Sequence, residues 1–268
     1  MKNIPIIQSL WIGGSLSPME KLSIQSFLDH GHEYHLYTYE GVPNAPDGAR
    51  IKDGSEIIES DKIFRHKETG SYADFSDIFR YKLLLSKGDF WVDTDVVCCQ
   101  PFTFTSRYVF ASEFEAWKPW YSWSRPSKVT NCVIRTPPDS EIMNYCYEKA
   151  TGHDDPAGAS WGTIGPELLG EAVDEYNMHQ HVVSPRAFCP INWWEWERFV
   201  NGTFSIRLYE RIRAYLFRPY AYHLWNSKWA LNGATKSDSF PKNSIYEQLK
   251  KKHAITSGQE QLDMSSSS

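Results

Sequence analysis

The sequence predicts an α/β fold, in which helices cover a sheet that contains parallel strands. Two observations carry this prediction. Residues 4–14, IPIIQSLWIGG, form a continuous apolar run that ends in a glycine pair, as is typical of a buried strand in a parallel sheet. A helical segment and an alternating segment follow this run, so the chain opens as β-α-β, the start of an open α/β sheet.

Each of the next elements carries a boundary signal. The first helix is predicted to begin at Ser17 and Pro18, because serine caps helices and proline suits the first helical position. Residues 33–40, EYHLYTYE, alternate as a second strand. Residues 71–88, SYADFSDIFRYKLLLSKG, predict a helix of about four turns that stops at a glycine. This helix leads directly into residues 88–99, GDFWVDTDVVCC, which predict a buried strand.

The second half of the chain predicts shorter elements and a change in composition. Three strands are expected over 107–114, 131–136 and 181–185, and two helices over 140–150 and 165–176. After Pro190 the chain becomes dense in aromatic and basic residues. We therefore predict one domain over 1–235 and a C-terminal extension over 236–268, with a serine-rich end that is expected to be disordered.

Composition excludes several classes of protein. With 41% hydrophobic and 23% charged residues among 268, the chain is neither disordered nor membrane-spanning in composition. A net charge of −5 gives no electrostatic reason to bind nucleic acid. The five cysteines include no CxxC pair, which argues against a disulfide framework or a zinc knuckle. No apolar core follows a basic start, so we expect no signal peptide and a cytoplasmic location.

Two aspartates interrupt the apolar run of residues 88–99. A buried carboxylate is costly unless it is paired, hydrogen-bonded or bound to a metal. In a strand, residues i and i+2 point to the same side, so Asp93 and Asp95 are expected to face one way. Neighbouring carboxylates repel unless a cation lies between them, and Mg²⁺ or Mn²⁺ prefers such oxygen ligands. The sequence therefore suggests a metal site here, with a solvated strand end as the alternative.

Other motifs are less specific. Asp77 and Arg80 share a helix face, a pattern that a simple surface ion pair also explains. Residues 158–162, GASWG, match the pattern of a serine hydrolase nucleophile at Ser160, but the preceding residues cannot form the buried strand that this motif requires. No Walker loop or G-x-G-x-x-G is present, so ATP hydrolysis and dinucleotide chemistry lose support.

Taken in order, these segments resemble the DXD-containing glycosyltransferases of family 32. The matching segments lie between about residues 4 and 230 and are IPIIQSLWIGG, SDIFRYKLLLSKGDFWVDTDV, VTNCVIRTPP, TIGPELL, FCPINWW and AYHLWNSKW. Some positions depart from the family pattern. Ile6 and Ser9 stand where lysine and histidine are usual, and Trp91 replaces the usual tyrosine. Asp89 replaces the second glycine of a pair and is expected to be solvated.

The resemblance implies both a fold and an activity. The implied fold is a GT-A, Rossmann-like nucleotide-sugar-binding domain with a mixed central sheet and helical, aromatic C-terminal additions. The implied activity is a retaining, metal-dependent transfer of a hexose, with UDP-galactose or UDP-glucose preferred over GDP-mannose as donor. The implied acceptor is a saccharide or lipid-linked saccharide in capsule, lipopolysaccharide or O-antigen synthesis. A non-catalytic carbohydrate-binding protein, which the eleven tryptophans would also suit, stays open as an alternative.

The resemblance also implies roles for individual residues. Trp11 would stack on the nucleobase, and Asp77 and Arg80 would bind the donor sugar. Asn131 would lie near the reacting sugar, so that Asp77, Arg80 and Asn131 form the implied catalytic group.

A second implied group binds the cofactor. Asp93, Asp95 and His223 would hold Mn²⁺ or Mg²⁺ together with the diphosphate. Three further residues would close the donor site, namely Trp225, Asn226 and Trp229.

The arginine-rich, aromatic stretch over 207–218 has two interpretations. It fits a helix that is partly core and partly surface, and it also fits a helix that lies on the inner face of the cytoplasmic membrane. Peripheral membrane association is thus a second expectation about location.

Overall fold

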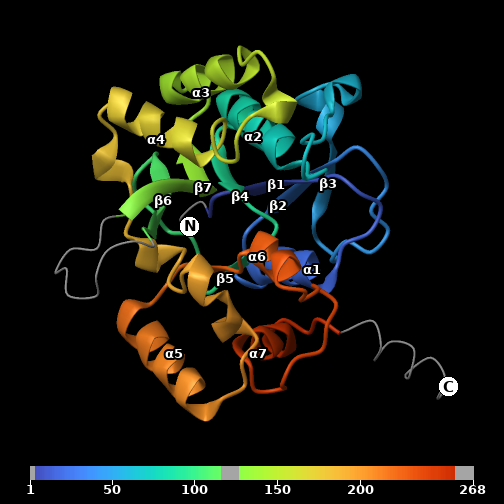
Figure 1. Cartoon of the computed structure of the whole chain (residues 1–268), viewed down its shortest axis with the longest axis vertical. Coiled ribbons are helices and arrows are strands. Elements are labelled where there is room, and N and C mark those ends of the chain that lie inside the picture. Colours follow the sequence, from blue (N-terminus) through green and yellow to red (C-terminus); the bar gives the residue numbers. More distant parts are fainter. Residues whose placement is uncertain (1–3, 116–126, 257–268) are drawn as a thin grey trace.

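A six-stranded mixed sheet lies at the centre of the molecule and confirms the predicted α/β class (Figure 1). The computed structural model describes residues 4–115 and 127–256. The strand order is β3-β2-β1-β4-β7-β6, and β7 runs antiparallel to both of its neighbours while β3, β2, β1 and β4 run parallel. These strands are β1 (Ile7–Trp11), β2 (Tyr34–Thr38), β3 (Arg50–Asp53), β4 (Asp89–Val92), β6 (Val109–Phe114) and β7 (Ser127–Thr136).

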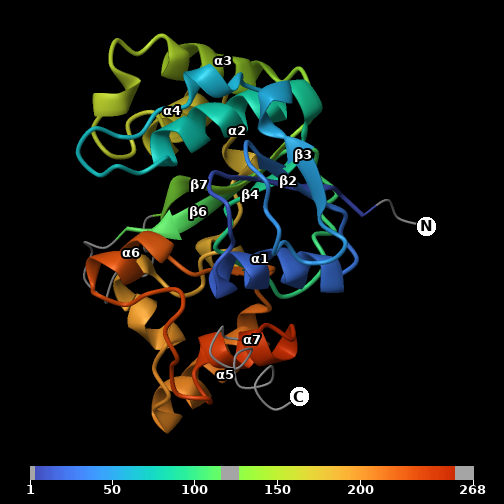
Figure 2. The same cartoon turned by 90° about the vertical axis from the view of Figure 1, so that its right-hand side faces the viewer.

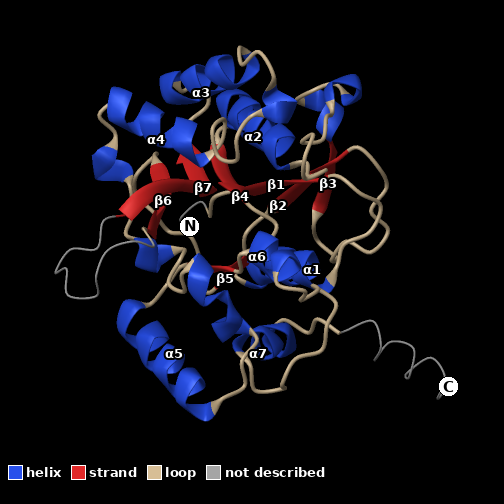
Figure 3. Cartoon of the chain, in the orientation of Figure 1, coloured by secondary structure: helices blue, strands red, loops and turns tan. Residues whose placement is uncertain are grey.

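Helices cover both faces of the sheet (Figures 1 and 3). One face is covered by α2 (Ala73–Lys87), α3 (Glu141–Thr151) and α4 (Pro166–Glu175), and the other by α1 (Pro18–Asp29) and the C-terminal part of the chain. Each face buries its own apolar cluster, because successive residues of a strand point to opposite sides.

The helix boundaries follow the signals in the sequence. Ser17 caps α1 by accepting a hydrogen bond from the Met19 amide, while Glu20 accepts one from the Ser17 amide at 2.7 Å. The helix α2 ends at Gly88, whose φ of +68° lies in the left-handed region that glycine favours. The predicted start of the first helix at Ser17 and Pro18 and the predicted helix over 71–88 are therefore confirmed.

The predicted continuous strand over residues 88–99 is wrong. The strand β4 ends at Val92, and β5 (Val96–Cys98) belongs to a separate two-stranded sheet with β8 (Ala221–His223). Between them the chain turns tightly, and the Val96 amide donates to the Asp93 carbonyl at 3.0 Å. Asp93 and Asp95 therefore lie on a turn between two sheets, and not on one side of a single strand. The predicted strand over 181–185 is also wrong, since Val182 makes only an isolated bridge to β6.

Asp89 is half-buried rather than solvated, which corrects a second expectation. Its φ of +68° suits the glycine that the family pattern has here. Its side chain contributes a contact that glycine lacks, because Oδ2 accepts a hydrogen bond from the Ile6 amide at 2.8 Å. Burial raises the pKa of the Asp89 carboxyl.

The C-terminal part of the chain is helical and aromatic, as predicted. Its elements are a 3₁₀ helix (Trp193–Phe199), α5 (Phe204–Phe217), α6 (Asn226–Leu231) and α7 (Ile245–Lys252). Short 3₁₀ turns elsewhere span Gly54–Glu56, Ser60–Lys62, Pro156–Gly158, His179–His181 and Pro185–Ala187.

Residues after 235 pack against the body of the molecule. Lys236 forms an ion pair with Glu20, and His253 Nδ1 lies 2.6 Å from Asp29 Oδ2, so both contacts reach α1. Tyr246 is fully buried beside Trp229. The domain boundary at 235 stays a prediction, and the expected disordered tail falls largely on residues 257–268, outside the described residues.

Candidate active site

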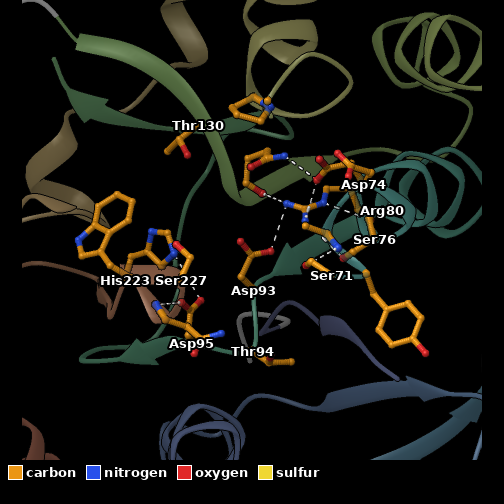
Figure 4. Close-up of a pocket in the computed structure, with 18 of the residues that line it drawn as sticks. Ser71, Asp74, Ser76, Arg80, Asp93, Thr94, Asp95, Thr130, His223 and Ser227 are labelled. Atoms are coloured by element: carbon orange, nitrogen blue, oxygen red, sulfur yellow. Dashed lines mark hydrogen bonds and ion pairs between the residues drawn. The ribbon is translucent and has the colours of Figure 1, made fainter. Parts of the chain in front are cut away.

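A cavity of about 460 Å³ lies at the turn between β4 and β5 (Figure 4). Its walls come from the end of β1, the start of α2, β7 and the start of α6. Every residue that the sequence suggested for donor or metal binding lines it except Trp229; these are Trp11, Asp77, Arg80, Asp93, Asp95, Asn131, His223, Trp225 and Asn226. The fold thus brings together side chains that are far apart in the sequence.

Arg80 is the centre of a buried network on one side of the cavity. Its guanidinium lies 2.9 Å from Asp77 Oδ1 and 3.1 Å from Asp93 Oδ1, and it donates to the Asn131 carbonyl at 2.6 Å. The Asn131 amide donates in turn to Asp77 Oδ1 at 2.9 Å. Arg80 and Asp77 are 5% and 7% exposed, so the alternative of a simple surface pair is wrong.

Trp91 supports this network. Its indole nitrogen donates to Asp93 Oδ1 at 2.9 Å, and the Arg80 guanidinium lies over its ring at 4.8 Å. Two donors therefore hold one oxygen of Asp93, which leaves Oδ2 as the oxygen available to another ligand.

Asp95 belongs to a separate group on the other side of the turn. Its Oδ1 lies 3.4 Å from His223 Nε2, and its Oδ2 accepts a hydrogen bond from the Asn226 amide at 2.8 Å. Figure 4 shows Asp93 turned toward Arg80 and Asp95 turned toward His223. Ligand atoms of Asp93, Asp95 and His223 nevertheless all lie within 4.8 Å of one another.

The charges of the cavity are incompletely balanced. Burial raises the pKa of Asp77 to about 7 in spite of the neighbouring Arg80. Burial also raises the pKa of Asp93. Burial also opposes ionisation of Asp95, but His223 and the Asn226 amide more than offset it and lower the pKa of Asp95. The residues that line the cavity include five carboxylates (Asp74, Asp77, Asp93, Asp95 and Glu113) and four basic side chains (Arg80, Lys128, Lys228 and His223). A divalent cation between Asp93 and Asp95 would offset the repulsion between these two carboxylates.

The donor set fits Mn²⁺ or Mg²⁺. Two carboxylates and an imidazole, within 4.8 Å of one another, can approach one ion together. Behind His223 lie two buried thiols, Cys132 and Cys189, whose sulfurs are 3.8 Å apart. Burial raises the pKa of both thiols. Cys189 Sγ lies 4.0 Å from His223 Nδ1, and ligand atoms of Cys132, Cys189 and His223 also lie within 4.8 Å of one another.

Trp229 does not line the cavity, which corrects its predicted contact with the donor. Its side chain is fully buried, its ring centroid lies 4.9 Å from that of Tyr246, and its indole nitrogen donates to the Leu224 carbonyl at 2.7 Å. Trp225, in contrast, lines the cavity beside His223. Its ring centroid lies 4.0 Å from that of His223, and its indole nitrogen donates to the Ile191 carbonyl at 2.8 Å. Trp225 therefore holds the His223 imidazole in place.

Several lining residues were not identified from the sequence. They are Glu113, Lys128, Thr130, Trp161 and Trp193. Glu113 and Lys128 form an ion pair at 3.2 Å, and the Trp161 side chain is 69% exposed. Glu113 lies on β6, Lys128 and Thr130 on β7, Trp161 on a loop and Trp193 at the start of a 3₁₀ helix, so no single sequence motif distinguishes them. The residues before Ser160 form a loop and a 3₁₀ turn, so the hydrolase motif lacks its strand.

Gly165 makes room for the Arg80 network. Tyr81 donates to the Gly165 carbonyl at 2.8 Å, which brings this backbone against Asp77. A Cβ atom at Gly165 would overlap Asp77 Oδ2 and lie 3.2 Å from the Asn131 amide nitrogen. Because Asp77 is already held by Arg80 and Asn131, its carboxylate cannot move away without breaking one of these contacts.

Gly165→Ala is expected to lower donor turnover by about tenfold or more, because it would displace Asp77, a group that positions the donor. A tenfold loss corresponds to an increase of roughly 1.4 kcal/mol in the activation free energy. The loss should appear in steady-state turnover of the nucleotide sugar. Gly170→Ala, on α4 and with its nearest contact at 4.0 Å, is the matched control and should stay near wild type. Equal turnover in Gly165→Ala and wild type would contradict the proposed importance of the Asp77 position.

Comparisons with known proteins point to one class of enzyme. The conserved region of the alpha-1,4-glycosyltransferases matches residues 136–259. The WbbM bifunctional glycosyltransferase is similar in structure, with a TM-score of 0.52 and 10% identity over 98% of this chain and 52% of that chain. The comparison with curated proteins gave no match.

Two toxin domains show weaker structural similarity. The PaToxG glycosyltransferase has a TM-score of 0.43 and 14% identity, over 96% of this chain and 87% of that one. The UDP-bound glycosyltransferase domain of the YGT toxin has a TM-score of 0.46 and 10% identity, over 80% of this chain and 90% of that one.

The matched region and the GT-A-like fold together support a glycosyltransferase enzyme. The structural similarity confirms the predicted fold, and the matched region supports the predicted enzyme class, whereas membership of family 32 in particular stays a prediction.

Proposed function

We propose that this chain is a metal-dependent, retaining glycosyltransferase that moves a hexose from a UDP-sugar to a saccharide acceptor. The observation that carries the proposal is the juxtaposition of two groups in one cavity. The ligand atoms of Asp93, Asp95 and His223 lie within 4.8 Å of one another, and Asp93 also contacts the buried Arg80 network. The resemblance of the sequence to family 32 favours UDP-galactose or UDP-glucose over GDP-mannose.

The cavity offers a place for each part of such a donor. Asp93 Oδ2, Asp95 and His223 would hold Mn²⁺ or Mg²⁺, which neutralises diphosphate oxygens when bound. Trp11, which lines the cavity, would stack on the base. Asp77 and Arg80 would bind sugar hydroxyls, with Asn131 beside the reacting carbon.

The proposed reaction retains the anomeric configuration of the sugar. The acceptor hydroxyl attacks the anomeric carbon from the face that the diphosphate leaves. A carbon–oxygen bond to the acceptor forms, the bond to the diphosphate oxygen breaks, and the hydroxyl proton passes to a phosphate oxygen. The protein contributes by positioning the sugar and by stabilising charge through Arg80.

Two alternatives and the biological setting belong to the same proposal. A non-catalytic carbohydrate-binding protein would have no use for five buried or half-buried carboxylates around one cavity, because their burial is costly. A GDP-mannose-using enzyme differs only in the donor.

We place the reaction in surface-polysaccharide synthesis in the cytoplasm, with a saccharide or lipid-linked saccharide as acceptor.

The test is metal-dependent release of nucleoside diphosphate from a panel of UDP-hexoses and GDP-mannose. One UDP-hexose should turn over in Mn²⁺, and EDTA should stop the reaction. Turnover of GDP-mannose alone would favour the alternative donor. Absence of turnover with every donor, or turnover that EDTA leaves unchanged, would reject the proposal.

Ser160→Ala should retain full activity, because the hydrolase motif lacks its structural context.

Trp161→Ala is expected to raise the KM for a saccharide acceptor by about tenfold, since an exposed indole on the cavity wall can stack on a sugar ring. Hydrolysis of the donor in the absence of acceptor should not change. Both rates can be measured with simple glycosides as acceptors. Trp194→Ala is the control, because Trp194 is also exposed and does not line the cavity. An unchanged acceptor KM in Trp161→Ala would remove Trp161 from the acceptor site.

A further inference from the structure

The helix α5 exposes an unusually large apolar face. Six of the eleven large hydrophobic side chains that are exposed among the described residues belong to it, with exposed fractions between 47% and 78%. They are Phe204, Leu208, Tyr209, Ile212, Tyr215 and Leu216. Their spacing follows the helical repeat, so they gather on one side of the helix. Figures 1 and 2 both show α5 at the end of the molecule away from α2 and α3.

The side of α5 that faces the rest of the protein carries the buried Glu210 together with the half-buried Ile206, Arg213, Ala214 and Phe217, so it leaves the larger apolar face outside. Glu210 is the only residue of the helix that is buried, at 4% exposure. Its carboxylate lies 2.8 Å from the Arg198 guanidinium and 3.0 Å from that of Arg213. Arg213 also donates to the Pro190 carbonyl. A surface helix of a soluble protein normally shows the opposite arrangement, with its apolar stripe toward the core.

The exposed charge on α5 is positive. Glu210, which is buried, is the single acidic residue between Phe204 and Arg218. Arg211 and Arg218 are exposed, and Arg207 is half-buried. This local excess of arginine contrasts with the net charge of −5 for the whole chain. The helix therefore combines apolar side chains with flanking cations, the composition of a helix that lies in a membrane interface.

We propose that α5 binds the surface of an anionic lipid bilayer. Its apolar side chains would enter the boundary between headgroups and acyl chains, and Arg207 and Arg211 would contact lipid phosphates. A second copy of the chain fits less well, because a two-fold contact of α5 with itself would bring exposed arginines together without acidic partners. This inference goes beyond the proposed function, since the binding needs neither metal nor donor.

The test uses the full chain and vesicles of phosphatidylcholine with or without phosphatidylglycerol. We expect the protein to sediment with the anionic vesicles and to bind pure phosphatidylcholine at least about tenfold more weakly. Raised salt should weaken the binding to anionic vesicles. Failure of the wild-type protein to sediment with anionic vesicles would overturn the proposal.

Matched variants separate the two parts of the face. Leu208→Ser combined with Ile212→Ser should reduce vesicle binding by about tenfold or more, since both apolar contacts are lost. Arg207→Gln combined with Arg211→Gln should remove the preference for anionic lipid. Ile51→Ser is the control, because Ile51 is 46% exposed on β3, away from α5, and should bind as the wild type does.

Two further readouts keep the outcomes distinct. Donor turnover in solution and the circular dichroism spectrum should stay at wild-type values in all these variants, because no α5 residue lines the cavity. Loss of vesicle binding with intact turnover would thus support α5 as the membrane contact, whatever the donor. Unchanged binding in the Leu208/Ile212 variant would overturn the proposal. A wild-type dimer in light scattering that becomes monomeric in this variant, without vesicle binding by either, would also overturn it and assign the face to a second copy.

Discussion

Asp95→Asn is expected to lower the metal-dependent release of nucleoside diphosphate by about a hundred- to thousandfold, the loss typical of removing one group that stabilises developing charge. The amide can still accept the hydrogen bond from the Asn226 amide, so the turn between β4 and β5 should persist. What it loses is the negative charge that pairs with His223 and would face the cation. The measurement is turnover of the preferred donor as Mn²⁺ is titrated.

Asp89→Asn is the matched control for this substitution. Asp89 lies at the other end of β4, outside the cavity, and an asparagine oxygen can also accept from the Ile6 amide. Its turnover should therefore stay near wild type. Mn²⁺ should raise the thermal midpoint of the wild type and of Asp89→Asn, but not of Asp95→Asn, because a ligand stabilises only the state that binds it. Full metal-dependent turnover in Asp95→Asn would argue against a metal site at this turn.

Arg80→Lys is expected to lower kcat/KM for the donor by about a hundredfold or more, although the charge is kept. The guanidinium contacts Asp77, Asp93 and the Asn131 carbonyl at once, and a single ammonium group cannot reach all three in this geometry. At least one carboxylate would lose its partner, so we also expect a loss of stability of about 3 kcal/mol, typical of a broken buried pair. Steady-state kinetics and urea unfolding measure the two effects separately.

Arg135→Lys provides the comparison. Arg135 is a half-buried arginine on β7 that donates to the Phe104 and Ser106 carbonyls and lies outside the cavity. It should lose some stability and little turnover. If both variants lose turnover in proportion to stability, Arg80 has only a structural role. If Arg80→Lys alone loses turnover while it remains folded at the assay temperature, the positioning role is supported.

Much of the fold could be predicted because its signals are local. The serine cap of α1, the glycine that ends α2 and the apolar run of β1 each act within a few residues. The strand over 88–99 was predicted wrongly because hydrophobicity continues across Asp93–Asp95 while the backbone leaves one sheet for another. That exchange depends on β8, more than a hundred residues away, with which β5 pairs.

The candidate site was predictable where residue types and spacing are specific, and not elsewhere. Asp93, Asp95, Asp77 and Arg80 belong to short motifs, and the structure places them in one cavity. Tryptophans carry no such information, because the same side chain suits a core or a binding surface. Trp229 was therefore assigned to the donor site although it is buried, while Trp161, exposed on the cavity wall, was overlooked.

The turn between β4 and β5 has a consequence for the order in which the protein becomes competent. Asp93 is held by Arg80 from α2, whereas Asp95 is held by His223 of β8 and by the Asn226 amide at the start of α6. A nascent chain that has passed Asn131 but has not yet reached His223 would contain the Arg80 network but lack one of the three candidate ligands and the amide that fixes another. The proposed chemistry would therefore become available only late in synthesis, once the last part of the chain has folded back onto the sheet.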